Sequence, residues 1–217
     1  MKDDSQAMAA EGVRFFGEIS ASISHEIKNV LAIINENAGL LQDMVMMIEK
    51  GMPLSPERLS GLARSIVRQV KRGDRIVKDM NRFAHSADHP SEIVDLGEVI
   101  HFICVLAARL IAMKGEPPKV EVPATPITAV TNRFFLEDLV WASLCRAMDA
   151  RDPNQMICIV AEKAGNAPRI RFCGLAEDFL ASEAGLPSPR ETIVAGLLGV
   201  QLKADREKGE ICLNFLK

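Results

Sequence analysis

The chain has 217 residues, of which 48% are hydrophobic and 25% are charged, and this composition predicts a globular protein of one or two domains. The formal net charge is only −3, which argues against a nucleic-acid-binding surface over the whole molecule. Nine Phe, one Trp and no Tyr leave few aromatic rings for stacking against bases or sugars.

The sequence carries no signal for export or for a membrane. Its start, "MKDDSQAMAAEG", is polar, and no apolar run reaches the length that crosses a bilayer. The cysteines are odd in number and form no Cys-x-x-Cys pair, so neither a disulfide framework nor a zinc site is expected. They are Cys104, Cys145, Cys158, Cys173 and Cys212. We therefore expect a cytoplasmic protein with reduced cysteines and no metal site of its own.

Residues 12–88 have the apolar periodicity of two long helices, with steps of four and three that place the apolar side chains in one stripe per helix. The stripe of the first helix comprises Ile19, Ile23, Ile27, Val30, Ile34, Ala38, Leu41, Val45 and Ile48. The stripe of the second comprises Leu59, Leu62, Ile66, Val70, Val77, Met80 and Ala84. Between them, Ser55 is a suitable N-cap and Pro56 suits the first helical position. The short connection predicts an antiparallel hairpin.

Two helices alone cannot bury both stripes. Each large apolar side chain left in water forfeits roughly 1.5–3 kcal/mol. A second copy of the hairpin would complete a four-helix bundle across a two-fold axis, so we expect a homodimer. The alternative is that the C-terminal half of the chain covers the hairpin.

Residues 92–217 alternate between helical and extended patterns. Helices are predicted over residues 96–115, 132–150 and 188–199. Strands are predicted in "PPKVEVP", "ITAV", "QMICIVAEK", "PRIRFCG" and, twice, in "VQLKADREKGEICLNFL". This mixture predicts an α/β sandwich of one sheet and one helical layer, and the whole chain is predicted to be α+β.

One histidine in the first helix has unusual neighbours, in "SISHEIKNVL". At about 100° per residue, His25 points away from the apolar stripe, with Asn29 and Ser22 on nearly the same face and Glu26 at its edge. An exposed imidazole titrates near neutral pH and can act as nucleophile, acid or base. A solvated surface histidine is the plainer interpretation.

Two other chemistries are less well supported. A zinc motif of the His-Glu-x-x-His type would need a histidine where Asn29 stands. A Ser-His hydrolase using Ser22 or Ser24 would need an oxyanion hole and an orienting acid, which a helix surface does not supply. His85 and His89 are also four residues apart, but they straddle a predicted helix end and are interpreted as surface residues.

The string "SISHEIKNVL" resembles the H-box of two-component sensor histidine kinases, commonly Ser-His-Glu-[Ile/Leu]-x-[Asn/Thr]-Pro-Leu. In that family a helical hairpin dimerises into a four-helix bundle that carries the phosphorylated histidine. The resemblance implies that His25 accepts the phosphoryl group, that Glu26 assists its transfer, and that Asn29 serves phosphatase activity. Val30 replaces the usual proline, so we expect a straighter helix here.

Beyond residue 92, the order of elements resembles the ATP-binding domain of these kinases, without its nucleotide motifs. Ala142 and Arg146 replace the two asparagines of the N-box. The Asp-x-Gly-x-Gly box is missing from "CGLAEDF", and the Gly-rich lid is reduced to "AGLLG".

This combination looks like the dimeric histidine phosphotransferases, which relay phosphoryl groups between response regulators without ATP. The resemblance implies no cofactor bound by this chain and Mg²⁺ supplied by the receiver partner. The alternatives are a response-regulator phosphatase, a non-catalytic regulator-docking module and a divergent sensor histidine kinase.

Arginines and lysines on the second helix also step by four and three, opposite its apolar stripe, beginning at Arg64. In an antiparallel hairpin, position 25 should lie level with about position 80, near Lys78 and Arg82. We predict that this basic stripe and neighbouring residues bind the acidic site of a receiver domain. The predicted partner-binding residues are Ser22, Lys28, Arg68, Lys71, Arg75, Lys78 and Arg82. The alternative is an ordinary solvated helix face.

Overall fold

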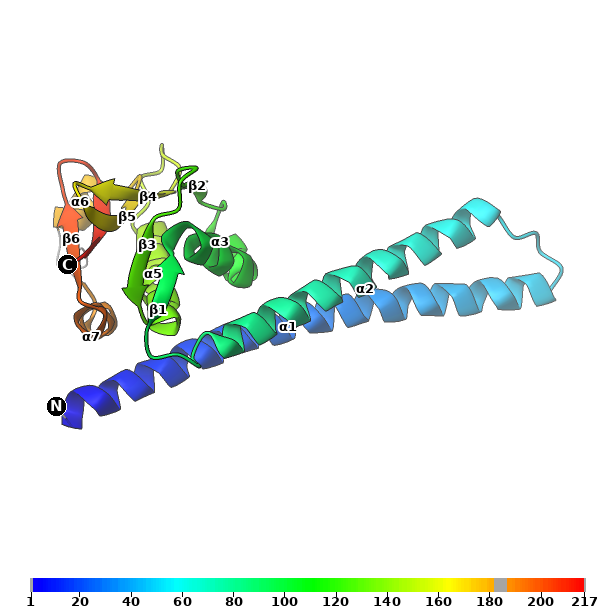
Figure 1. Ribbon diagram of the computed structural model, residues 1–217. Coiled ribbons are helices and arrows are strands. Elements are labelled where there is room, and N and C mark those ends of the chain that lie inside the picture. Colours follow the sequence, from blue (N-terminus) through cyan, green and yellow to red (C-terminus); the bar gives the residue numbers. More distant parts are fainter. Residues whose placement is uncertain (1, 182–186, 217) are drawn as a thin grey trace. The chain divides into compact units, whose positions relative to one another are not determined.

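The computed structural model describes residues 2–181 and 187–216 (Figure 1). The chain divides into two compact units, one formed by Ser20–Ala84 and the other by Met1–Ile19 together with His85–Lys217. The first is helical and the second contains the sheets, so the predicted α+β class is confirmed.

The helical unit is an antiparallel hairpin of α1 (Lys2–Glu49) and α2 (Pro56–His85), as predicted. Ser55 caps α2, since its Oγ accepts the backbone N–H of Arg58 at 3.4 Å. The two helices approach closely where Gly73 faces Val30, and a Cβ added to Gly73 would lie 3.3 Å from Val30 Cγ1. Figure 1 shows α1 and α2 side by side along this hairpin.

Four buried residues of α1 within the hairpin recur every seven positions. Ile23, Val30, Asn37 and Met44 are 4%, 3%, 8% and 8% exposed. A spacing of seven marks the narrow seam along which two helices pack. The wider apolar stripe stays partly in water, because its members Val45 and Ile48 are 54% and 47% exposed.

Helix α1 begins ten residues before the predicted start of the hairpin at residue 12. Its first part, up to Ile19, belongs to the unit that contains the sheets. Phe15 and Ile19 are fully buried there, and the Phe15 ring lies 5.3 Å from that of Phe134. Periodicity identifies an apolar face but not the neighbour that covers it, and this is why the sequence did not assign these residues to the second unit.

The second unit contains a five-stranded sheet in the order β2-β4-β5-β7-β6, antiparallel except for the β2–β4 pair. Its strands are β2 (Lys119–Glu121), β4 (Cys158–Ala164), β5 (Ala167–Cys173), β6 (Val200–Asp205) and β7 (Glu210–Phe215). A separate two-stranded sheet pairs β1 (Glu92–Asp95) with β3 (Thr128–Thr131). The helices are α3 (Leu96–Leu106), α4 (Ala108–Lys114), α5 (Arg133–Asp149), α6 (Glu177–Ala181) and α7 (Pro189–Leu198).

Three details of this unit differ from the sequence prediction. The helix expected over residues 96–115 is broken at Ala107 into α3 and α4, whose axes differ by 72°. Strand β1 and helix α6 were not predicted, and β3 pairs with β1 instead of joining the large sheet. Ala107 is fully buried, so tertiary packing at this point overrides the helix-forming tendency of the local sequence.

Among the described residues, no single helix is long and apolar enough to cross a membrane. Helices α3 and α4 meet a length and composition test only when they are taken together as a bent pair.

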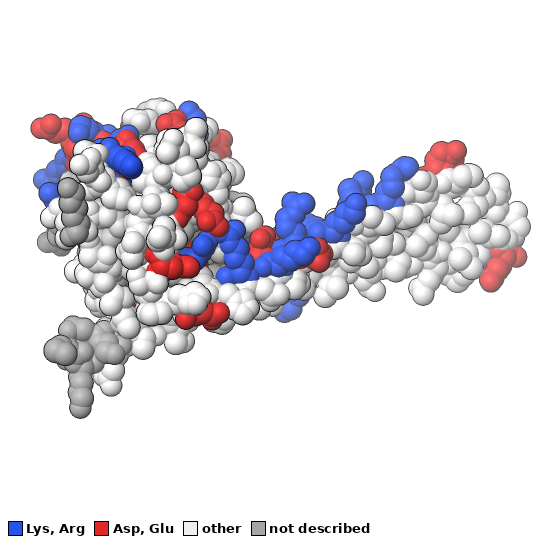
Figure 2. All heavy atoms as spheres, viewed as in Figure 1, with Lys and Arg blue, Asp and Glu red and all other residues white. Residues whose placement is uncertain are grey.

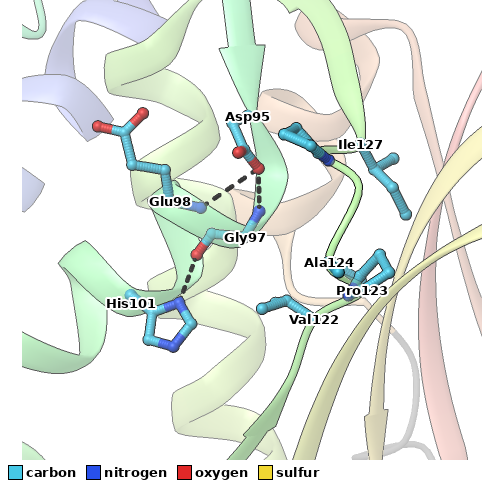
Figure 3. Close-up of a pocket in the computed structure, with 10 residues that line it drawn as sticks. Asp95, Gly97, Glu98, His101, Val122, Pro123, Ala124 and Ile127 are labelled. Atoms are coloured by element: carbon cyan, nitrogen blue, oxygen red, sulfur yellow. Dashed lines mark hydrogen bonds between the residues drawn. The ribbon is translucent and has the colours of Figure 1, made fainter.

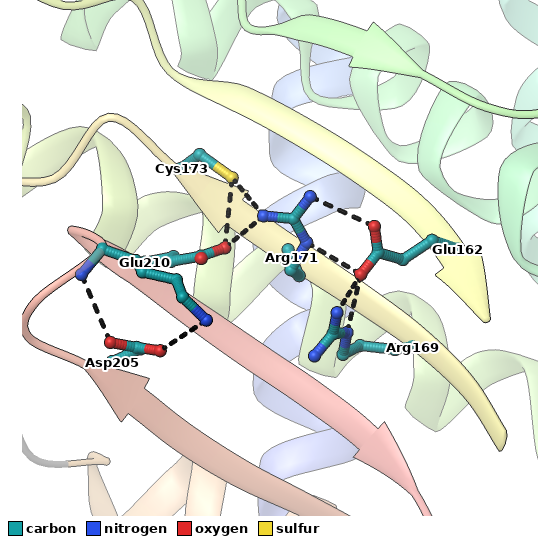
Figure 4. Close-up of polar contacts among 7 residues, drawn as sticks. Glu162, Arg169, Arg171, Cys173, Asp205 and Glu210 are labelled. Atoms are coloured by element: carbon teal, nitrogen blue, oxygen red, sulfur yellow. Dashed lines mark hydrogen bonds and ion pairs between the residues drawn. The ribbon is translucent and has the colours of Figure 1, made fainter. Parts of the chain in front are cut away.

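The large sheet has one apolar and one polar face. Ile159, Ile170, Phe172, Ile211 and Leu213 are fully buried, and along β5 the buried residues alternate with Arg169 and Arg171. The opposite face carries a network of ion pairs (Figure 4). Glu162 pairs with Arg169 and Arg171, and Arg171 also pairs with Glu210. These carboxylates raise the pKa of Arg171. The network covers the outer face with mutually neutralised charges.

We predict that Gly174→Ala lowers the free energy of unfolding by more than about 2 kcal/mol. Gly174 has a φ of +90°, and a Cβ there would lie 2.6 Å from the carbonyl oxygen of Met156. Gly165→Ala is the matched control, because Gly165 has a φ of +63° and open space around it. The control should cost about 1 kcal/mol. Urea denaturation measures both variants, and equal losses would contradict the steric argument.

Candidate functional site

His25 and Asn29 lie on the exposed side of α1, one helical turn apart, as expected. Lys28, also predicted to contact a partner, is exposed beside them. On the other side of the helix, Ile23 and Val30 are buried in the seam. The seam therefore holds the helix in an orientation that leaves the His25 imidazole in water, where another protein can reach it.

Ser22 does not share this exposed face, and the prediction that it contacts a partner is wrong. It is only 2% exposed, and its hydroxyl has no hydrogen-bond partner among the described residues. Three residues of α-helix turn through about 300°, so Ser22 is displaced about 60° from His25 toward the apolar stripe.

Glu26 pairs with Arg72 of α2. Their side chains are 25% and 48% exposed, so the pair contributes at most about 1 kcal/mol to stability. In the described part of the chain the His25 imidazole makes no hydrogen bond, and Glu26 lies beside it in sequence without binding it. Arg72 was missed because it falls between the steps of the predicted basic stripe. The pairing depends on how two long side chains reach across the hairpin, which only the structure shows.

The basic stripe is present and exposed. Figure 2 shows the blue side chains in a row along the hairpin, and Arg68, Lys71, Arg75, Lys78 and Arg82 are all exposed. Lys78 Nζ lies 2.8 Å from the carboxylate of Asp74. Within residues 2–181 and 187–216, no carboxylate pairs with Arg68, Lys71 or Arg75.

The level of His25 on the hairpin follows from the contact between Val30 and Gly73. Because both helices rise equally per residue in opposite directions, His25 lies level with residue 78, close to the predicted position 80. The stripe thus extends along α2 on both sides of that level.

The position that corresponds to the N-box is occupied by a buried ion pair between α5 and α7. Arg146 Nε lies 3.1 Å from Glu191 Oε1, and the two side chains are 9% and 2% exposed. Ser143 Oγ donates to the same oxygen at 3.3 Å. Burial lowers the pKa of Arg146, and the nearby Glu191 carboxylate opposes this shift. The sequence shows Arg146 as a departure from the N-box but does not identify its partner, because Glu191 lies on a distant helix.

Glu191 is placed by the start of α7. Its backbone N–H donates to Ser188 Oγ at 3.2 Å, and its Oε2 accepts the backbone N–H of Ser188 at 2.9 Å. This reciprocal capping box leaves Oε1 directed at Arg146 and Ser143. The Ser-Pro helix start read from the sequence is therefore also what aims this carboxylate.

A pocket of about 250 Å³ lies beside the start of α3 (Figure 3). Its polar groups serve the local fold: Asp95 Oδ1 accepts the N–H groups of Gly97 and Glu98, and Glu98 pairs with Arg133 at 3.1 Å. His101 Nδ1 lies 2.8 Å from the Gly97 carbonyl oxygen. Among the described residues, no three His, Cys, Asp or Glu side chains form a group that could hold a metal.

Residues 17–88 match the family described as "His Kinase A (phospho-acceptor) domain". The chain resembles the core of a sensor histidine kinase. The match covers the hairpin and includes His25, and it supports a protein of two-component signalling. No curated protein sequence matches the chain.

The solved structures that match the chain have low sequence identity. The Acinetobacter baumannii histidine kinase AdeS has 16% identity and a TM-score of 0.44, over 82% of this chain and 94% of that chain. A bacterial phosphotransferase has 13% identity and a TM-score of 0.43, over 92% and 94%. Histidine kinase ThkA in complex with the response regulator TrrA has 17% identity and a TM-score of 0.45, over 99% of this chain and 65% of that one.

Proposed function

We propose that the protein exchanges a phosphoryl group between His25 and the aspartate of a response-regulator receiver domain, without ATP. The observation that carries this proposal is the exposed His25 on a hairpin that matches the phospho-acceptor family. Asn29, exposed one turn later, would assist a water molecule in breaking the bond between phosphorus and the aspartyl oxygen of the receiver, which releases inorganic phosphate. Phosphatase activity toward the receiver could therefore use the same exposed face of α1.

In the proposed reaction, the Nε2–P bond forms while the bond between phosphorus and the aspartyl oxygen breaks, and the aspartate leaves as a carboxylate. The transition state is loose and in line, so catalysis depends on positioning and charge neutralisation. Mg²⁺ is expected to come with the receiver partner.

Glu26 would hold Nδ1–H of the imidazole and keep Nε2 free to attack. Proton-transfer assistance of this kind typically contributes about 10²–10⁴-fold. In the structure Glu26 is paired with Arg72, so this role requires the carboxylate to exchange Arg72 for the imidazole. Arg72 would then be released close to the incoming phosphoryl group, where a guanidinium is favourable.

The buried pair of Arg146 and Glu191 supports the absence of ATP from the reaction. A guanidinium has only donors and cannot ligate a cation. Arg146 is also held by a carboxylate that is 2% exposed, so it is not poised to move aside. Arg146 and Glu191 therefore do not fit Mg-ATP, and the proposed reaction does not use it.

A homodimer through the hairpin is part of the proposal. The partly exposed apolar residues Leu31, Val45 and Ile48 of α1 are matched on α2 by Val67, Val70 and Val77, which are 52%, 55% and 46% exposed. A second hairpin would cover both sets. The unpaired cations Arg68, Lys71 and Arg75 would attract an acidic receiver domain by electrostatic steering.

A divergent sensor histidine kinase is the second candidate. The match to a kinase family and the kinase-like order of elements in the second unit favour it. The two candidates differ in one measurable property, the use of Mg-ATP.

We predict that His25→Ala abolishes acceptance of a phosphoryl group from a phosphorylated receiver. The wild type should give an acid-labile, base-stable phosphoprotein that is absent in the variant. The variant should change the free energy of unfolding by no more than about 0.5 kcal/mol, because the side chain is exposed. Asn29→Ala is the comparison, since a pure phosphatase would lose more activity in that variant. Acceptance by His25→Ala at the wild-type rate would refute the assignment of His25.

We predict no measurable binding of Mg-ATP in calorimetry and no autophosphorylation with labelled ATP. The reason is the Arg146–Glu191 pair at the position that corresponds to the N-box. Micromolar affinity together with labelling of His25 would instead establish the kinase.

We predict that light scattering gives twice the monomer mass at micromolar concentration, and that Val70→Glu shifts the protein toward monomer. A charge at this apolar position would be buried without a partner in the bundle. Lys71→Glu is the control, because it lies next to Val70 on the exposed basic stripe and should leave the dimer intact. A monomeric wild type would exclude the bundle.

A further inference from the structure

The second unit contains a cluster of charges in which three helices meet around one guanidinium, with Arg190 and Asp138 buried and Glu11 and Glu18 partly exposed. We call it the Arg190 cluster: Arg190 of α7, Asp138 of α5, and Glu11, Phe15 and Glu18 of α1. No part of the proposed phosphoryl transfer uses these residues.

The members from α1 share one helical face, since Glu11, Phe15 and Glu18 are spaced by four and three. Phe15 is fully buried, and the Arg190 guanidinium carbon lies 5.9 Å above its ring centroid. Arg190 also lies 3.6 Å from a carboxylate oxygen of Glu11 and 3.6 Å from one of Glu18.

The same face makes two further contacts with α5. Trp141 Nε1 donates to Glu18 Oε1 at 3.0 Å, and the rings of Phe15 and Phe134 are 5.3 Å apart. Residues 11–19 of α1 are therefore attached to the α5–α7 layer by apolar, aromatic and charged contacts together.

The charged contacts of the cluster all involve the Arg190 guanidinium. Asp138 is fully buried and accepts two hydrogen bonds from this guanidinium, one of them from Nε at 2.9 Å. Burial raises the pKa of Asp138 to about 6, although Arg190 acts in the opposite direction. With three carboxylates around it, Arg190 is the counter-ion that makes their approach possible.

Helix α1 continues without a break from Lys2 to Glu49. His25 follows Glu18 by seven residues, which is about 10 Å along a helix. We propose that the α5–α7 layer clamps residues 11–19 of α1 through Arg190, and that this clamp regulates phosphoryl transfer at His25. The regulatory part rests on the proposed function. The second unit would thus act on the phospho-acceptor helix mechanically, by limiting the opening and fraying of the turns that precede the histidine.

Two variants release the clamp from opposite sides. Arg190→Met removes the guanidinium but leaves Asp138 buried without its partner, which endangers the fold. Glu11→Gln with Glu18→Gln changes only the α1 side and keeps an acceptor for Trp141. The matched controls are Arg206→Met and Glu36→Gln, both at exposed positions outside the cluster. Circular dichroism shows which variants remain folded.

Hydrogen exchange of the amides of residues 8–19 measures the clamp in the full-length protein. Both clamp variants should exchange these amides at least about tenfold faster than the wild type, and the controls should not. Unchanged exchange in the folded Glu11→Gln, Glu18→Gln variant would overturn the clamp.

Phosphoryl transfer from a labelled receiver measures the regulation. Coupling of this kind typically corresponds to about 2- to 30-fold, so we expect the clamp variants to accept the phosphoryl group slower by a factor in that range. Faster exchange with an unchanged transfer rate would overturn the regulatory role. If the wild type accepts no phosphoryl group from any receiver, the proposed function fails, while the exchange measurement still decides the clamp.

Discussion

Helix α1 carries more apolar surface than any single neighbour in the chain covers, and most of the structure follows from how this surface is distributed. The first nineteen residues bury Phe15 and Ile19 in the unit that contains the sheets. Further along, the buried residues that recur every seven positions from Ile23 to Met44 pack in the hairpin. Other apolar residues of the stripe, such as Val45 and Ile48, stay exposed. Both packing arrangements use the same side of α1, so the opposite side is left polar.

His25 and Asn29 occupy that polar side. A phospho-acceptor must be reachable by a second protein, and a helix anchored by its opposite face meets this requirement without a cleft. The proposed reaction needs little beyond this, because a loose transition state depends on positioning and charge. The basic stripe of α2 extends past the level of His25, and its members Arg68, Lys71 and Arg75 pair with no carboxylate in the described part of the chain.

The second unit is organised around buried ion pairs between α5 and α7. Arg146 pairs with Glu191, and Arg190 pairs with Asp138, so two successive residues at the start of α7 are both committed to α5. Buried pairs of this kind contribute little net stability but are costly to break from one side. These pairs join α5 and α7 into one layer, and Arg190 also contacts Glu11 and Glu18 at the start of α1.

The sequence by itself determined the helical hairpin, the cap at Ser55, the β4–β5 hairpin and the start of α7 at Ser188, because periodicity and capping are local properties of the chain. It also determined which face of α1 carries His25, since apolar residues define the opposite face. The tertiary structure alone decided that Ser22 is buried, that Glu26 binds Arg72, that Ala107 breaks a helix and that residues up to Ile19 leave the hairpin. These outcomes depend on which distant segment covers a given face, and side chains far apart in sequence carry that information only once they are packed together.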